Sequence, residues 1–173
     1  MATQRISVKD LDIKVSEASI SIDGLYRWWL YRCWEPDKPV LIWVMMNPST
    51  ADWRKNDPTI CKTMRYAARW GYGGILVLNI YAYRTSRPEN LPREMSVAVG
   101  PKNDWWLSTI FEFAADRDIP VICAWGVKHQ ERGRFVRQLA DDAGLELQCL
   151  EVALNGEPKH PRFLSEDLRP RHL

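Results

Sequence analysis

The sequence predicts a single α/β domain with three α/β/α layers, in which a central four-stranded parallel sheet carries additional N-terminal edge strands. Continuous apolar runs bounded by turn residues recur along the chain, as is typical of buried parallel strands. Segments with helical periodicity alternate with these runs. At 173 residues and 46% hydrophobic composition, the chain suits one domain with a sizeable core. We expect one domain over residues 1–173, with an arm to about residue 24 and a core over about 25–165.

The N-terminal part of the chain supplies the edge strands and the first central strand. Residues 1–24 alternate weakly in hydropathy and predict an arm or an edge strand. The aromatic-rich segment 26–34 predicts a strand, which ends at a proline-containing turn at 35–39. The run Val40–Met46 is apolar throughout and predicts a central strand that ends abruptly at Asn47.

Helices and strands then alternate to the end of the predicted sheet. Asp57 is a predicted N-cap and Pro58 the first residue of a helix that Gly71 ends. The remaining predicted elements are strands at 74–79, 120–126 and 145–152, and helices at 103–115 and 131–143. Because β-α-β crossovers are right-handed, this order favours a parallel sheet with helices on both faces.

The composition argues against several classes of protein. No apolar run reaches the roughly 18 residues that span a bilayer, and the N-terminus has no signal-peptide hydrophobic region. We therefore expect a soluble, cytoplasmic protein without a membrane partner. The four cysteines form no C-x-x-C pair, so we expect reduced, buried thiols, no metal site and no cofactor. Sequence patterns of P-loops, dinucleotide folds, zincins and hydrolase elbows do not occur.

The charge of the chain leaves the partner open. The net charge is only +2, which does not require nucleic acid. Basic residues nevertheless gather within 54–69 and within 159–171 and could line a local basic groove. Solvated helix faces and a tail explain the two clusters equally well.

Polar side chains follow the predicted parallel strands, where open α/β sheets bind ligands. Asn47 can orient a water or read an amide edge, unless it only closes a turn on its own backbone. Asn79 can bond the edge of a heterocycle, unless it only satisfies a loop. His160 lies in a proline-containing loop and can stabilise a developing anion, unless it is an ordinary exposed histidine.

The order of several short motifs resembles a bacterial and phage domain family of unknown function. The motifs are NPSTAD, DPT, RWGYG, LNIYAYR, GPKND, AWG and GEPKHP, over about residues 25–165. A more distant resemblance is to the uracil-DNA glycosylase superfamily, whose members are four-stranded parallel α/β/α domains. Their strand-end motifs GQDPY or GINPG, LLLN, LLWGxxAQ and HPSP resemble Met46–Ser49, Leu76–Asn79, Ala124–Gln130 and His160–Phe163.

The glycosylase resemblance implies an enzyme that acts on DNA bases. It would hydrolyse the N-glycosidic bond of a flipped uracil-like or modified base, with Asn47 positioning water and His160 stabilising the leaving base. Trp53 and Tyr81 are the candidates for stacking on that base. The other expected substrate-binding residues are Pro48, Ser49, Asn79 and Trp125, and the expected DNA contacts are Arg84, Lys128, Lys159 and Arg162.

Two alternative functions use the same predicted pocket. One is a non-catalytic reader of modified or damaged DNA, and the other is an enzyme on free nucleotides or nucleosides. The salt dependence of DNA binding separates the last of these from the others, because contacts to phosphates give a steep slope. DNA is the expected partner and a monomer the expected state.

Overall fold

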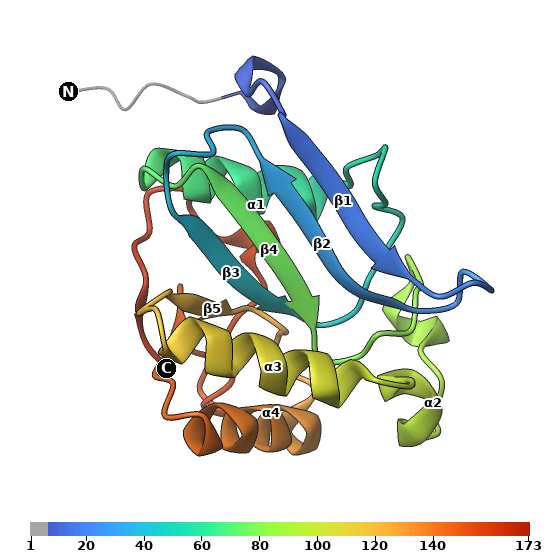
Figure 1. Ribbon diagram of the computed structural model, residues 1–173. Helices are drawn as coiled ribbons and strands as arrows, with labels where there is room; N and C mark the ends of the chain where they lie inside the picture. The colour runs from blue at the N-terminus through green and yellow to red at the C-terminus, as the bar shows by residue number, and fades with distance from the viewer. Residues whose placement is uncertain (1–6) are drawn as a thin grey trace.

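In the computed structural model, which describes residues 7–173, a seven-stranded mixed sheet forms the centre of the molecule (Figure 1). The strand order is β1-β2-β4-β3-β5-β6-β7. Pairing is parallel within β4-β3-β5-β6 and antiparallel at both edges. The strands are β1 Val15–Ile20, β2 Arg27–Cys33, β3 Val40–Met45, β4 Gly74–Asn79, β5 Val121–Cys123, β6 Leu147–Cys149 and β7 Arg171–His172.

The α/β class is confirmed, and the sheet is mixed. The antiparallel edge formed by β1 and β2 comes from the N-terminal part of the chain, where edge strands were expected. The opposite edge, β7, was not predicted. It comprises two exposed residues that pair with β6, and so short a polar segment has no hydropathy pattern of its own. The predicted strands at 120–126 and 145–152 are also shorter than expected, with three residues each.

Helices lie on both faces of the sheet (Figure 1). They are α1 Pro58–Arg69, α2 Met95–Val99, α3 Asn103–Ala115 and α4 Gln130–Asp142, with short 3₁₀ turns η1 Val8–Asp10, η2 Pro88–Asn90 and η3 Pro161–Phe163. The side chain of Asp57 accepts a hydrogen bond from the backbone N–H of Ile60 at 2.9 Å, so the predicted N-cap is confirmed. Gly71, just beyond the end of α1, has a φ of 88°, a conformation that favours glycine.

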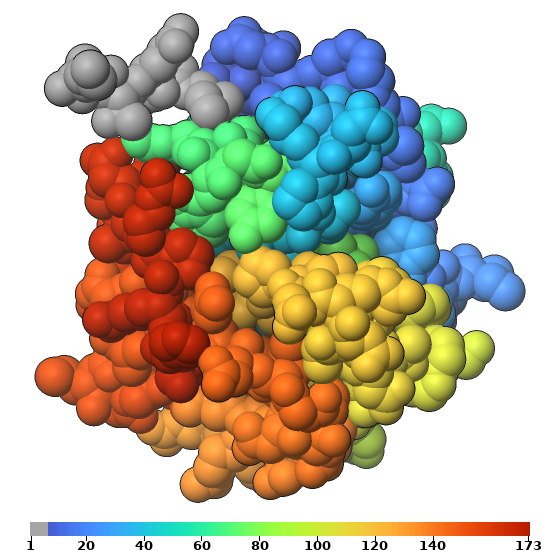
Figure 2. Space-filling model, turned by 60° about the vertical axis from the view of Figure 1, so that its left-hand side comes forward, coloured from blue at the N-terminus to red at the C-terminus, as the bar shows by residue number. Residues whose placement is uncertain are grey.

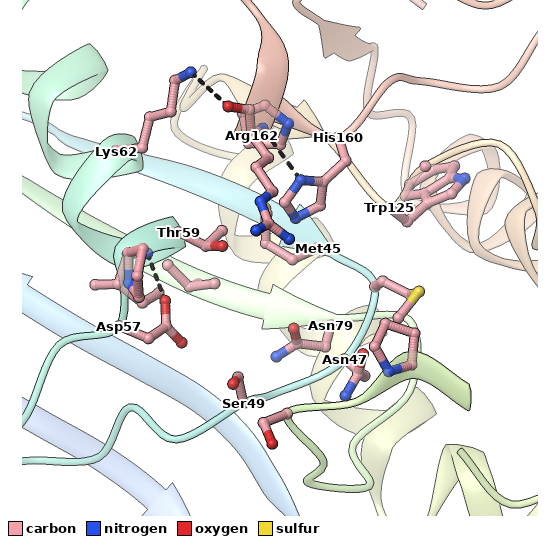
Figure 3. A pocket seen from close by; sticks show the side chains of 18 of the residues that line it. Met45, Asn47, Ser49, Asp57, Thr59, Lys62, Asn79, Trp125, His160 and Arg162 are labelled. Carbon is pink, nitrogen blue, oxygen red and sulfur yellow. Dashed lines mark hydrogen bonds between the residues drawn. The ribbon is translucent and has the colours of Figure 1, made fainter. Parts of the chain in front are cut away.

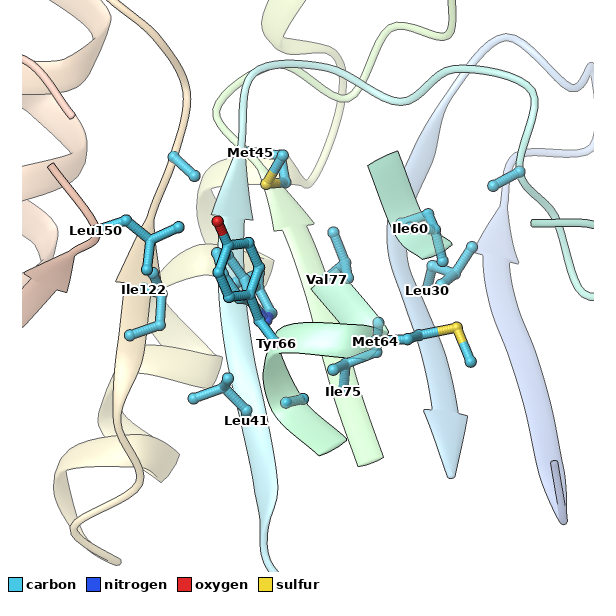
Figure 4. Packing of buried hydrophobic residues seen from close by; sticks show 14 of the residues in the cluster. Leu30, Leu41, Met45, Ile60, Met64, Tyr66, Ile75, Val77, Ile122 and Leu150 are labelled. Carbon is cyan, nitrogen blue, oxygen red and sulfur yellow. The ribbon is translucent and has the colours of Figure 1, made fainter. Parts of the chain in front are cut away.

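The face that α1 covers holds one half of the core (Figure 4). Ile60 and Met64 of α1 belong to the same buried cluster as Leu41 of β3 and Val77 of β4. Trp43 is completely buried there and contacts Tyr66 and Trp70, and its ring stacks on that of Trp70 at 6.1 Å.

The opposite face packs against α3 and α4. Ile42 and Val44 of β3 point to this side and share a cluster with Phe111 of α3 and Val136 of α4. Alternate residues of β3 therefore enter opposite halves of the core, as expected for a strand buried on both faces.

The described residues 7–173 contain no helix long and apolar enough to cross a membrane. All four cysteines are free thiols; three are buried and Cys61 is half-buried. Within the same part of the chain, no group of three His, Cys, Asp or Glu side chains is arranged to hold a metal ion.

Candidate functional site

A cavity of about 820 Å³ lies at the carboxyl ends of β3 and β4, beside the start of α1 (Figure 3). Its volume is typical of pockets for small organic ligands. Seven of the sequence-predicted site residues line it: Asn47, Ser49, Asn79, Trp125, Lys128, His160 and Arg162. These residues come from four separate segments of the chain, so the fold brings the ends of the predicted strands together.

Asn79 is a buried polar residue of this cavity whose side-chain amide has no partner in the described part of the chain. It continues the row of Ile75 and Val77, which face α1, and is only 1% exposed. Neither Nδ2 nor Oδ1 has a hydrogen-bond partner among residues 7–173. The backbone carbonyls at the end of β4 are bonded by Asn103 instead, because its Nδ2 donates to the carbonyls of Asn79 and Ile80 at 3.1 and 3.2 Å. A buried polar group without a partner costs about 1–3 kcal/mol, so the Asn79 amide points to a ligand.

Asn47 has one half of its amide engaged by the protein. Its Nδ2 donates to the carbonyl of Thr85 at 2.8 Å and to that of Pro48 at 3.0 Å. These bonds tie the loop after β3 to the segment after β4 and set the orientation of the amide. The Oδ1 atom makes no hydrogen bond within residues 7–173 and remains available as an acceptor.

His160 is held as a neutral hydrogen-bond donor. Its Nδ1 accepts a hydrogen bond from the backbone N–H of Arg162 at 3.2 Å, so the ring proton belongs on Nε2 (Figure 3). Burial, and then the charge of Arg162, lower the pKa of His160 below its usual value of 6.5. A neutral imidazole with a proton on Nε2 can donate to charge that develops on a ligand.

Trp125 has a structural role at the cavity wall. It is 1% exposed and belongs to the core on the α3 and α4 side. Its Nε1 donates to Oε2 of Glu157 at 2.7 Å, so the indole is fully satisfied without a ligand.

Five predicted site residues lie outside the set that lines the cavity. Tyr81 is behind the wall, where its hydroxyl pairs with Nδ1 of the cavity residue His129 at 3.3 Å. Arg84 donates to the carbonyl of Gly24 at 3.0 Å, and Lys159 forms an ion pair with Glu151. The other two are Pro48, which is buried, and Trp53, which is half exposed.

The basic cluster of α1 holds the C-terminal segment in place. Lys62 donates to the carbonyls of Arg162 and Leu164 at 3.1 and 2.7 Å. One and two turns further along α1, Arg65 pairs with Glu166 and Arg69 with Asp167. In Figure 2 the C-terminal residues, in red, lie against α1, in green. These cations therefore position η3 beside the cavity, and only part of the predicted basic groove is free.

Two charged residues of the cavity were missed by sequence reasoning. Asp57 was assigned only as a helix cap, yet it is 7% exposed and is the one carboxylate that lines the cavity among the described residues. Arg27 lines the cavity and is 2% exposed. In the sequence, Arg27 is only a charged residue at the start of an aromatic-rich strand, and this pattern does not indicate that its side chain is buried.

The capping role of Asp57 predicts a difference between two substitutions. Asp57→Ala should lower the free energy of unfolding by about 1 kcal/mol, because the Ile60 N–H loses its acceptor. Asp57→Asn should leave stability nearly unchanged, because asparagine caps helices equally well. Urea denaturation followed by circular dichroism measures both, and equal stability of the alanine variant and the parent would contradict the capping role.

Fold and cavity together define an α/β domain with a ligand-sized pocket at the carboxyl ends of parallel strands. The chain belongs to the family described as protein of unknown function, DUF1643, whose model matches residues 27–162. The match extends from the start of β2 into η3, so it includes nearly all the residues that line the cavity. The family membership predicted from the order of the motifs is thus confirmed. No curated protein and no solved structure matches the chain, and the resemblance to uracil-DNA glycosylases stays a prediction.

Proposed function

We propose that the chain is an enzyme acting on bases in DNA, a glycosylase-like hydrolase that takes a flipped uracil-like or modified base into the cavity. The observation that carries the proposal is the buried amide of Asn79, whose donor and acceptor are both unpartnered. The edge of a pyrimidine presents a donor beside an acceptor, so one bound base satisfies both atoms. Removing a base from the stack is what allows such an enzyme to reach it.

The neighbouring groups suit hydrolysis of the N-glycosidic bond. Oδ1 of Asn47 accepts a hydrogen bond from the attacking water, whose oxygen adds to the sugar carbon. The C–N bond breaks, its electron pair leaves with the base, and Nε2–H of His160 stabilises the resulting charge. Asp57 is the cavity carboxylate that accepts the proton of the water.

The arrangement of the elements supports the same proposal at the level of the fold. Parallel pairing within β4-β3-β5-β6, with helices on both faces, agrees with a glycosylase-like α/β/α architecture. Fold alone does not define an activity, so the proposal depends on the cavity residues.

A second candidate is an enzyme on free nucleotides. Of the four predicted DNA contacts, Lys128 and Arg162 line the cavity, whereas Arg84 and Lys159 are engaged elsewhere. A cavity with so few free cations at its rim also suits a ligand that brings a single phosphate.

Base release from synthetic substrates tests the proposal. Single- and double-stranded DNA carrying uracil, hydroxymethylated or hypermodified pyrimidines, and the matching free nucleotides, are incubated with the protein, and released bases are separated by chromatography. Release from DNA is expected. Release from free nucleotides alone would favour the second candidate, and salt-sensitive DNA binding without any release would replace the enzyme with a reader of modified DNA.

Exchanging the Asn79 amide for a carboxylate is expected to change which base is accepted. Asn79→Asp loses both N–H donors, so a base that offers a carbonyl to Nδ2 should bind about 10- to 100-fold more weakly. A base with an exocyclic amino group should be less affected. Competition binding with a panel of bases measures the change, with Gln138→Glu on the exposed face of α4 as the control. An unaltered preference would remove Asn79 from base recognition.

A further inference from the structure

Two arginines of β2 are buried, and they differ in how well the protein satisfies them. Arg32 is 1% exposed, and all three of its guanidinium nitrogens donate hydrogen bonds. Nε bonds Oδ1 of Asn56 at 2.8 Å, and the other two nitrogens bond backbone carbonyls, including those of Asp52 and Lys55 in the loop before α1. Arg32 therefore has a complete structural explanation as a clamp on this loop.

Arg27 is equally buried and is largely unsatisfied. Its Nη1 donates to the carbonyl of Ala51 at 2.9 Å, but Nε has no partner and Nη2 makes no hydrogen bond within residues 7–173. Nε and Nη2 form one edge of the guanidinium, the edge that binds two oxygens of a phosphate or carboxylate side by side. This free edge belongs to a residue that lines the cavity.

The charge of Arg27 also lacks a close counter-charge. No ion pair involves Arg27 in the described part of the chain, and the neighbouring Arg84 and Arg32 add positive charge. Burial lowers the pKa of Arg27 to about 10, with Asp57 and, more weakly, Asp52 acting in the opposite direction, so the side chain is still charged at neutral pH. Buried arginines are normally paired, and this one faces a cavity in which Asp57 is the one acidic side chain among the described residues.

We propose that Arg27 anchors an anion subsite in the cavity, which receives a phosphate of the nucleotide whose base binds Asn79. The phosphate supplies two acceptors for the Nε and Nη2 edge and the missing counter-charge. Arg162 and Lys128 at the rim add positive potential that favours a phosphate over a neutral group. This inference rests on the proposed function only in taking a nucleotide as the ligand.

Inorganic phosphate is the first probe, because its binding needs neither the correct base nor catalysis. Phosphate should raise the melting temperature of the parent protein at constant ionic strength, since a ligand that binds the folded state stabilises it. Arg27→Gln should weaken phosphate binding about 10- to 100-fold, as expected for loss of charged hydrogen bonds. Arg27→Lys keeps the positive charge but lacks the two-nitrogen edge of the guanidinium, so it should lose less phosphate affinity than Arg27→Gln.

Matched variants separate this role from a general effect on folding. Circular dichroism and melting temperature report whether the Arg27 variants are folded. If Arg27→Gln does not fold, phosphate binding is compared between the parent and Arg27→Lys. Arg117→Gln removes the same group from an exposed position in the turn after α3 and should bind phosphate like the parent. Absence of phosphate stabilisation in the parent, or parent-like affinity in a folded Arg27 variant, would overturn the subsite.

Nucleotide probes identify the source of the phosphate. Deoxyuridine monophosphate, deoxyuridine and a short strand with internal deoxyuridine are compared by calorimetry. Loss of monophosphate affinity alone in Arg27→Gln indicates a free nucleotide, whereas equal loss with the strand indicates DNA; both outcomes support the subsite. Phosphate binding without base release would reject the proposed function and retain the subsite. Base release without Arg27-dependent phosphate binding would reject the subsite and retain the proposed function.

Discussion

Asn47→Ala is expected to slow base release by about 10²- to 10⁴-fold, the range typical of a positioned group that handles water or a proton. The change removes the Oδ1 acceptor that orients the attacking water. It also removes the Nδ2 bonds to the carbonyls of Thr85 and Pro48, so alanine alone cannot separate catalysis from loop structure.

Asn47→Asp makes that separation. Aspartate keeps an acceptor for water but lacks the N–H donors that hold the loop. Single-turnover base release should therefore stay near the parent rate in Asn47→Asp and fall in Asn47→Ala. If both variants are equally slow, the role of Asn47 is structural.

His160→Phe is expected to reduce base release by about 10²- to 10³-fold, the cost of removing one donor to a developing anion. The parent rate should rise with pH through the lowered pKa of His160 and then level off, because only the neutral ring accepts at Nδ1 and donates at Nε2. This rise of the rate at acidic pH, the acid limb of the pH profile, should be missing in His160→Phe. His172→Phe, at the exposed β7 edge, is the control and should keep both the rate and the limb. An unchanged limb in His160→Phe would assign the titration to another group.

The same residue predicts how stability depends on pH. A histidine whose pKa is lower in the folded than in the unfolded state binds protons more readily when unfolded. Its contribution to stability is therefore complete above the unfolded pKa near 6.5 and is lost as the pH falls below it. Urea denaturation of the parent and His160→Phe across this range should show a smaller loss of stability on acidification in the variant.

Local patterns were sufficient to predict the elements that border the cavity. The apolar run Val40–Met46 became β3, and the DPT motif became the start of α1 with its capping hydrogen bond. The shortest α-helix and the shortest strand of the described residues, α2 and β7, were missed, because five and two residues are too few to show a period. The aromatic candidates Trp53 and Tyr81 came from the glycosylase resemblance, and neither lines the cavity.

By itself, the sequence determined the α/β class, the family, and the strand-end positions at which polar side chains would meet. Each depends on contiguous residues: an apolar run, a cap followed by proline, or a motif in a given order. The tertiary structure alone decided which of these side chains are free, because their partners come from distant segments. Asn47 donates to the carbonyl of Thr85, and Arg65 pairs with Glu166. Within residues 7–173, Arg27 donates to the carbonyl of Ala51 and forms no ion pair, and the amide of Asn79 has no hydrogen-bond partner. Hydrogen bonds over such separations depend on the packing of whole elements, which no local pattern contains.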